Sequence, residues 1–172
     1  MRTRELLEFV ILFAAAAGLL FAGDRLGTSA QQGLSFGVAL WAGLKTLYYL
    51  FETLRHLAEA TSTDLAYHRF LLLMAYNMAQ ITLSYALDFY CLYRIDPTSL
   101  TGIDPEIRGL ELLFECFYFS VLNFSFFGYG DITPAHMPGK IVMLLEVITA
   151  FSTVIFLLSD FVSMKESMRR KP

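Results

Sequence analysis

The chain has 172 residues, of which 56% are hydrophobic and 17% are charged, and its mean hydropathy is +0.53. This composition excludes an ordinary soluble domain of this length and predicts an all-α membrane protein. The formal net charge of −3 points to no particular partner, and nothing in the sequence predicts binding to nucleic acid.

Four apolar segments are long enough to cross a bilayer as helices, since a hydrocarbon core of ~30 Å needs ~20 helical residues. They cover residues 6–22, 34–51, 70–90 and 141–158. The first also resembles a signal peptide, but nearby acidic residues favour a retained helix. A fifth apolar run, residues 112–127, either spans the membrane or re-enters it.

The distribution of basic residues favours re-entry of the fifth run. In that topology eight basic residues share one side of the membrane and four lie on the other, and the excess marks the cytoplasmic side. The eight are Arg2, Arg4, Arg55, Arg69, Lys165, Arg169, Arg170 and Lys171, and the four are Arg25, Arg94, Arg108 and Lys140. Both termini are therefore expected in the cytoplasm, with a short basic tail that could attract anionic membrane lipids.

Residues 126–131 read Phe-Phe-Gly-Tyr-Gly-Asp and lie between the fifth apolar run and the last span. Bare backbone at membrane depth is tolerated only where protein buries it or where it lines a watery cavity. Because glycine reaches conformations that other residues resist, a Gly-Tyr-Gly turn can aim its carbonyls at one axis. Rings of such carbonyls replace the hydration shell of a cation.

This segment resembles the selectivity filter of the potassium-channel pore family, whose usual pattern is Thr-Val-Gly-Tyr-Gly-Asp. The resemblance runs from residue 70 to about residue 162 and is most specific over residues 118–140. It implies an outer helix, a pore helix, a filter loop and an inner helix, with four chains around one axis. The pore-helix residues expected to support the filter are Tyr118, Phe119, Ser120, Leu122 and Ser125.

The resemblance also implies roles for the filter residues Phe126, Phe127, Gly128, Tyr129, Gly130 and Asp131. The backbone carbonyls of residues 127–129 would hold potassium or another monovalent cation, and no other cofactor is expected. The Tyr129 ring would pack outward against aromatic side chains such as Tyr118 and Phe119. The Asp131 carboxylate would brace the filter through hydrogen bonds behind it.

Two substitutions depart from the family pattern at the inner end of the filter. Phe126 replaces a threonine whose hydroxyl supplies the innermost ion ligands, and Phe127 replaces a small β-branched residue. Leu122 stands where some members carry a buried acid. Two interpretations follow: a cation channel with one ion site lost, or a channel-like structural or regulatory subunit that the Phe126 rings obstruct, non-conducting or conditionally conducting.

Four residues of the last span are candidates for the cavity or the inner helix: Glu146, Ala150, Thr153 and Val154. Glu146 lies mid-span, where an ionisable group is costly and faces protein or water. Four such carboxylates would line the cavity and meet ions, or each would be a buried, hydrogen-bonded acid behind the pore helix.

Residues 67–172 form the expected pore module, and residues 1–66 add two helices that are not a voltage sensor. A voltage sensor needs several basic residues at three-residue spacing, whereas Lys45 is the one mid-span cation. Lys45 either snorkels or pairs with an acid on another span, for which Asp88 and Glu146 are alternatives. Cys91 and Cys116 could form a disulfide, but buried thiols are favoured.

Other classes of function find less support. The three histidines, His56, His68 and His136, form no catalytic or metal-binding spacing, so no enzyme is predicted. A transporter would show inverted repeats, and none is visible. The small size favours the plasma membrane of a prokaryote, and gating by a soluble ligand would require a separate regulatory subunit.

Overall fold

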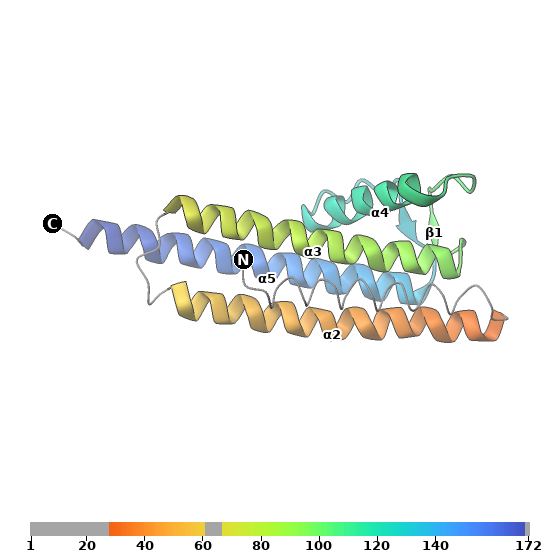
Figure 1. Ribbon diagram of the computed structural model, residues 1–172, viewed down its shortest axis with the longest axis horizontal. Coiled ribbons are helices and arrows are strands. Elements are labelled where there is room, and N and C mark those ends of the chain that lie inside the picture. The colour runs from red at the N-terminus through yellow and green to blue at the C-terminus, as the bar shows by residue number, and fades with distance from the viewer. Residues whose placement is uncertain (1–27, 61–66, 171–172) are drawn as a thin grey trace.

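The computed structural model describes residues 28–60 and 67–170, which form four helices and two short strands. Three long helices run side by side: α2 (Thr28–Ala60), α3 (Tyr67–Ile95) and α5 (Met137–Arg170) (Figure 1). The predicted span at residues 6–22 lies outside the described residues. The described part is therefore mostly helical, in agreement with the expected fold class.

Each long helix extends beyond the apolar segment that predicted it. The three helices have 33, 29 and 34 residues, because backbone hydrogen bonding continues into polar sequence that a hydropathy window excludes. Among the described residues, two stretches are long and apolar enough to cross a membrane, Gln31–Phe51 in α2 and Met137–Ser159 in α5. The predicted basic tail is helical up to Arg170, as a continuation of α5.

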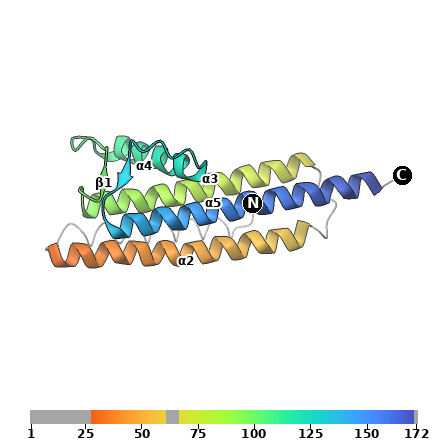
Figure 2. The ribbon, with the colours of Figure 1, turned by 180° about the vertical axis from the view of Figure 1, so that it is seen from behind.

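Helix α5 contacts α2, α3 and α4, and helix α3 likewise contacts each of the other three helices of the described residues. The largest buried side chains of α3 are Ile81, Tyr85, Phe89 and Leu92, which are fully excluded from solvent. They recur every three or four residues, so one stripe of the helix faces the core. Helix α2 packs mainly along α5, which completes the group of three long helices (Figure 2).

The fifth apolar run forms the short helix α4 (Gly109–Phe124), which packs on α3 and α5 at one end of the molecule. Its 16 residues correspond to about 24 Å of helix, which is shorter than a bilayer core. The expected run of residues 112–127 is helical only as far as Phe124; Ser125 caps the helix, and Phe126 and Phe127 already belong to the filter segment.

Two short strands bring the chain before α4 next to the chain after the filter segment. Strand β1 (Leu100–Thr101) pairs antiparallel with β2 (Thr133–Pro134), with Leu100 opposite Pro134 and Thr101 opposite Thr133. The intervening chain, residues 102–132, therefore leaves one end of the molecule and returns to it (Figure 1).

Candidate functional site

Helix α4 ends in a Schellman motif, in which Phe126 takes the left-handed position that glycine usually occupies. The Phe127 N–H donates to the Leu122 carbonyl at 2.9 Å, and the Phe126 N–H donates to the Asn123 carbonyl at 3.1 Å. Phe126 has a φ of 59°. These two bonds satisfy carbonyls at the end of the helix, and they turn the chain sharply into the filter segment.

Positive φ values recur at alternate residues of the filter segment. They are 59° at Phe126, 51° at Gly128 and 79° at Gly130, and Phe127 and Tyr129 between them have none. Glycine adopts this conformation without strain, whereas phenylalanine does so at a cost of ~1–2 kcal/mol. The two glycines are thus required by the backbone, and Phe126 is a strained residue at the inner end.

The aromatic side chains of the filter segment form two ring pairs. The Phe126 ring meets the Phe151 ring of α5 edge to face, with centroids 6.2 Å apart. The Phe127 and Tyr129 rings stack with centroids 6.3 Å apart. Phe119, one of the aromatic residues expected to pack against Tyr129, packs edge to face on Phe89 of α3, with ring centroids 4.7 Å apart.

Asp131 closes the filter segment and is held from α4, as expected. The Tyr118 hydroxyl donates to the Asp131 carboxylate at 2.8 Å, and the Ile132 N–H donates to the other carboxylate oxygen at 2.9 Å. The Tyr118 hydrogen bond lowers the pKa of the exposed Asp131 carboxyl below its usual value. The same bond raises the pKa of the Tyr118 phenol, so this contact favours the ionised acid and the neutral tyrosine.

The loop before α4 packs directly against the backbone of Asp131. Gly102 has a φ of +92°, and a Cβ placed there would lie 1.8 Å from the Asp131 carbonyl oxygen. Beside it, the Thr101 hydroxyl lies 2.7 Å from the Thr133 hydroxyl. Only glycine fits this close approach, so Gly102 fixes the exit of the filter segment against β1.

Glu146 is a fully buried acid behind α4, with 0% of its side chain exposed. Its carboxylate contacts the Ser120 hydroxyl, and it accepts a 3.1 Å hydrogen bond from the Asn123 amide. Ser120 Oγ also lies 2.7 Å from the Thr82 carbonyl oxygen of α3. A hydroxyl has one proton, so Ser120 satisfies both partners only if Glu146 is protonated and donates to it.

This geometry decides between the two alternatives for Glu146, in favour of the buried acid behind the pore helix. Ala150 and Thr153 are also buried, so that face of α5 turns toward the rest of the chain and not toward open space. Val154 is half-buried. Among the described side chains of α5, the large exposed apolar ones are Met137, Leu144, Ile148, Phe151, Ile155 and Leu158.

A second buried polar group joins α2 to α3. Lys45 forms an ion pair with Asp88, and the two side chains are 2% and 5% exposed. The Lys45 ammonium also donates to the Ser84 carbonyl at 3.0 Å and lies 4.6 Å from the centre of the Tyr85 ring. Of the two acids expected for Lys45, the structure selects Asp88.

Hydroxyl contacts extend this group from α2 to α5. The Tyr85 hydroxyl lies 2.5 Å from the Thr46 hydroxyl of α2 and 3.0 Å from the Thr149 hydroxyl of α5. One tyrosine of α3 thereby bridges both neighbouring helices. Together with Glu146, these contacts tie α4, which supports the filter segment, to all three long helices.

The structure also places the remaining residues that were singled out from the sequence. Cys91 and Cys116 are buried thiols that form no disulfide with each other. The Ser125 hydroxyl donates to the Leu122 carbonyl at 3.2 Å and so belongs to the end of α4. Sequence reasoning missed Asn123, Thr46, Tyr85 and Thr149, whose hydrogen bonds run between helices. Polar residues spaced along apolar helices are common, so this sequence pattern does not distinguish these four residues from others.

Comparisons with known proteins agree with this architecture. A family model described as ion channel matches residues 73–166, more than half of the chain. A hyperpolarization-activated voltage-gated potassium channel of Methanocaldococcus jannaschii is 34% identical over 55 residues, which cover 32% of this chain and 25% of that protein. This chain thus matches about a quarter of the relative's length. No solved structure matches the chain.

The family match covers α4, the filter segment and most of α3 and α5. The chain belongs to the ion-channel family that this model describes. It is accordingly a membrane protein of the ion-channel class, and this class is one of transport proteins rather than enzymes.

Proposed function

We propose that the chain is one subunit of a homotetrameric channel that passes potassium or other monovalent cations. The observation that carries the proposal is the filter segment, where positive φ recurs at residues 126, 128 and 130 directly after the re-entrant helix α4. One chain supplies one filter strand, so a closed ring of strands requires several copies around a symmetry axis.

In the proposed mechanism, the carbonyls of Phe127, Gly128 and Tyr129 form successive oxygen rings that replace the hydration shell of the ion. Helix α4 would direct its partly negative C-terminal end toward the centre of the membrane, which favours a cation there. Asp131, held by Tyr118, fixes the outer end of each strand. Potassium is the transported ion here, and not a bound cofactor.

An apolar surface of the single chain supports assembly with further copies. It includes the three exposed filter rings and parts of α4 and α5, and large exposed apolar surfaces mark sites of protein or lipid contact. Its members include Leu110, Phe114, Val121, Phe126, Phe127, Tyr129, Leu144, Ile148 and Phe151. In the tetramer this surface would be shared between neighbouring subunits and the pore.

The proposed topology has α2, α3 and α5 spanning the membrane and α4 re-entering from the outer side. The return of the chain from β1 to β2 supports re-entry, and the excess of basic residues supports cytoplasmic termini. The proposed location is the plasma membrane of a prokaryote, with lipids around the helices and a regulatory partner still to be identified.

A second candidate function rests on one specific contact. Phe126 and Phe151 meet at the inner end of the filter segment, and the two side chains are 48% and 59% exposed in the single chain. Four such pairs around an axis would narrow the path below the filter. This contact favours a conditionally conducting or non-conducting channel-like subunit.

Cation flux through purified protein in liposomes tests the proposal, with potassium and sodium gradients compared. The decisive variants are Phe126→Thr, which restores the family hydroxyl, and Phe151→Ala, which removes the other ring of the pair. Ile155→Ala on the exposed side of the same helix is the matched control.

Potassium flux through the unmodified chain would support the channel. A silent chain that conducts after Phe126→Thr or Phe151→Ala, but not after Ile155→Ala, would support the obstructed subunit. Silence of all four proteins, each confirmed as a folded tetramer, would contradict conduction through this filter.

A further inference from the structure

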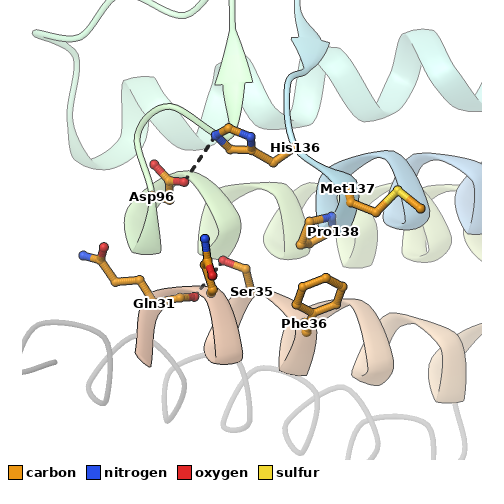
Figure 3. Close-up of a pocket in the computed structure, with 8 residues that line it drawn as sticks. Gln31, Ser35, Phe36, Asp96, His136, Met137 and Pro138 are labelled. Carbon is orange, nitrogen blue, oxygen red and sulfur yellow. Dashed lines mark hydrogen bonds and ion pairs between the residues drawn. The ribbon is translucent and has the colours of Figure 1, made fainter. Parts of the chain in front are cut away.

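A pocket of about 510 Å³ opens at the filter end of the molecule, between the start of α2, the end of α3 and the start of α5 (Figure 3). Gln31 and Phe36 of α2 lie on one side of it, and Asp96 and His136 lie on the other. Neither Asp96 nor His136 takes part in the filter or in its buried support. Their side chains are 33% and 51% exposed, so dissolved ions reach both.

Three polar side-chain atoms lie close together at the edge of this pocket. His136 Nε2 lies 3.6 Å from Asp96 Oδ2 and 3.1 Å from Thr98 Oγ1. The other carboxylate oxygen of Asp96 accepts hydrogen bonds from the Thr98 N–H at 2.9 Å and from the Thr98 hydroxyl at 2.6 Å. Those bonds fix the orientation of the carboxylate and leave Oδ2 facing the imidazole.

These separations match the spacing of ligands around a small divalent metal ion. Zinc binds histidine nitrogen and carboxylate oxygen at about 2.0–2.2 Å, so two ligands of a tetrahedral ion lie about 3.4 Å apart. Imidazole and carboxylate together suit zinc and neighbouring transition metals. We propose that Asp96 and His136, assisted by Thr98, bind a divalent transition metal ion of the zinc class.

The site has two strong ligands, and the described residues contain no group of three or more His, Cys, Asp or Glu side chains that could hold a metal. Water molecules would fill the remaining coordination positions of the ion. A metal ion binds the lone pair of His136 Nε2, so in the bound state that nitrogen bonds to the metal instead of to Thr98 and the proton of the neutral ring lies on Nδ1.

The position of the site gives the bound metal a structural consequence. Asp96 and Thr98 follow directly after α3, and His136 lies between β2 and α5. A backbone hydrogen bond from Ala135 to Ser99 already joins these segments at 2.9 Å. A metal ion bound to both would clamp the loop that precedes α4 to the segment that leaves the filter.

Zinc titration of the purified full chain in lipid nanodiscs, followed by calorimetry, tests this site without requiring ion conduction. We expect one zinc ion per chain, with affinity weakened at least ~10-fold by His136→Ala and by Asp96→Asn, and less by Thr98→Val. His56→Ala and His68→Ala are the matched controls, because both residues lie toward the opposite ends of α2 and α3.

Cobalt binding offers a second measurement, because the visible absorption of a bound cobalt ion reports its coordination by imidazole and carboxylate directly. Absorption bands that disappear in His136→Ala but persist in His68→Ala would support the site. Absence of zinc binding to the unmodified chain at millimolar concentration would overturn the proposal. Undiminished binding by the folded double variant Asp96→Asn/His136→Ala would overturn it as well.

Discussion

Lys45 of α2 and Asp88 of α3 form an ion pair in the interior of the protein, where both side chains are almost fully buried. Removing two charges from water costs several kcal/mol per ion, and only close mutual contact offsets that cost. The additional hydrogen bond from Lys45 to the Ser84 carbonyl contributes to this offset. Helix α2 is therefore an integral part of the protein and is not loosely attached beside α3.

Removing either partner of this ion pair should destabilise the protein more than removing both. Lys45→Met or Asp88→Leu alone leaves an unpaired buried charge, at a cost of about 3–5 kcal/mol. The double variant buries no charge and should recover most of that loss. Thermal unfolding of the purified protein measures this, and equal destabilisation by the single and double variants would contradict the coupling.

Substitutions of Glu146 should separate its hydrogen bonds from its charge. In Glu146→Gln, the amide can donate to Ser120 and still accept from Asn123, so little stability should be lost. Glu146→Ala removes the acceptor of the Asn123 amide and leaves Ser120 with only its contact to the Thr82 carbonyl among those described, at about 1–3 kcal/mol for a buried group left unsatisfied.

Thr153→Ala is the matched control for Glu146, because within the described part of the chain the Thr153 hydroxyl donates to the Thr149 carbonyl of its own helix. It should cost less than Glu146→Ala in the same unfolding measurement. If Glu146→Gln unfolded as early as Glu146→Ala, then the acid would need its negative charge, and the proton assigned to it would be wrong.

Phe126 offers a direct test of backbone strain at the start of the filter segment. Phe126→Gly and Phe126→Ala both remove the ring contact with Phe151, but only glycine relieves the positive φ. We expect the glycine variant to be the more stable of the two by about 1–2 kcal/mol. Equal unfolding temperatures would show that the left-handed conformation is not retained.

The Tyr118–Asp131 hydrogen bond should make the filter exit resistant to acid. Since the bond lowers the pKa of Asp131, its contribution is complete above the ordinary aspartate pKa of about 3.9. That contribution is lost as the pH falls through the lower folded value. Tyr118→Phe should shift the acid loss of stability to higher pH, which unfolding temperatures between pH 7 and pH 3 would reveal. Superimposable acid profiles would contradict this role.

Gly102 should tolerate no side chain, whereas a glycine of α2 should accept one. Gly102→Ala forces a Cβ into the Asp131 carbonyl, so we expect a loss of thermal stability and a disturbed filter exit. At Gly37 an added Cβ meets nothing within 4 Å, and alanine there should stabilise the helix by up to ~1 kcal/mol. Similar unfolding temperatures for the two variants would contradict the close approach.

The order of the elements could be predicted because apolar segments and a glycine-containing turn are signals local in sequence. The partners of the buried charged side chains could be predicted only as alternatives. The sequence offered two candidate acids as partners of Lys45. Which of them pairs with it depends on how α3 is rotated about its axis and shifted along α2. Glu146 likewise had two environments, and only the packing of α4 against α5 separates them.

The conformation of Phe126 could not be predicted, since the sequence carries no glycine at the position where the Schellman motif requires a left-handed residue. The preference of a phenylalanine is overridden there by the hydrogen bonds that end α4. The pocket beside Asp96 and His136 could not be predicted either, because these two residues are 40 positions apart in the sequence and β-strand pairing brings their segments together.

The Lys45–Asp88 pair has a consequence for how the protein enters its membrane. A lysine at the centre of an isolated helix opposes insertion by about 2.5–3.5 kcal/mol, and an aspartate does so by a similar amount. Each charge is neutralised only when the other helix is present. Helices α2 and α3 are therefore expected to enter the lipid as a hairpin, with the pore helix and α5 added to a pair already formed.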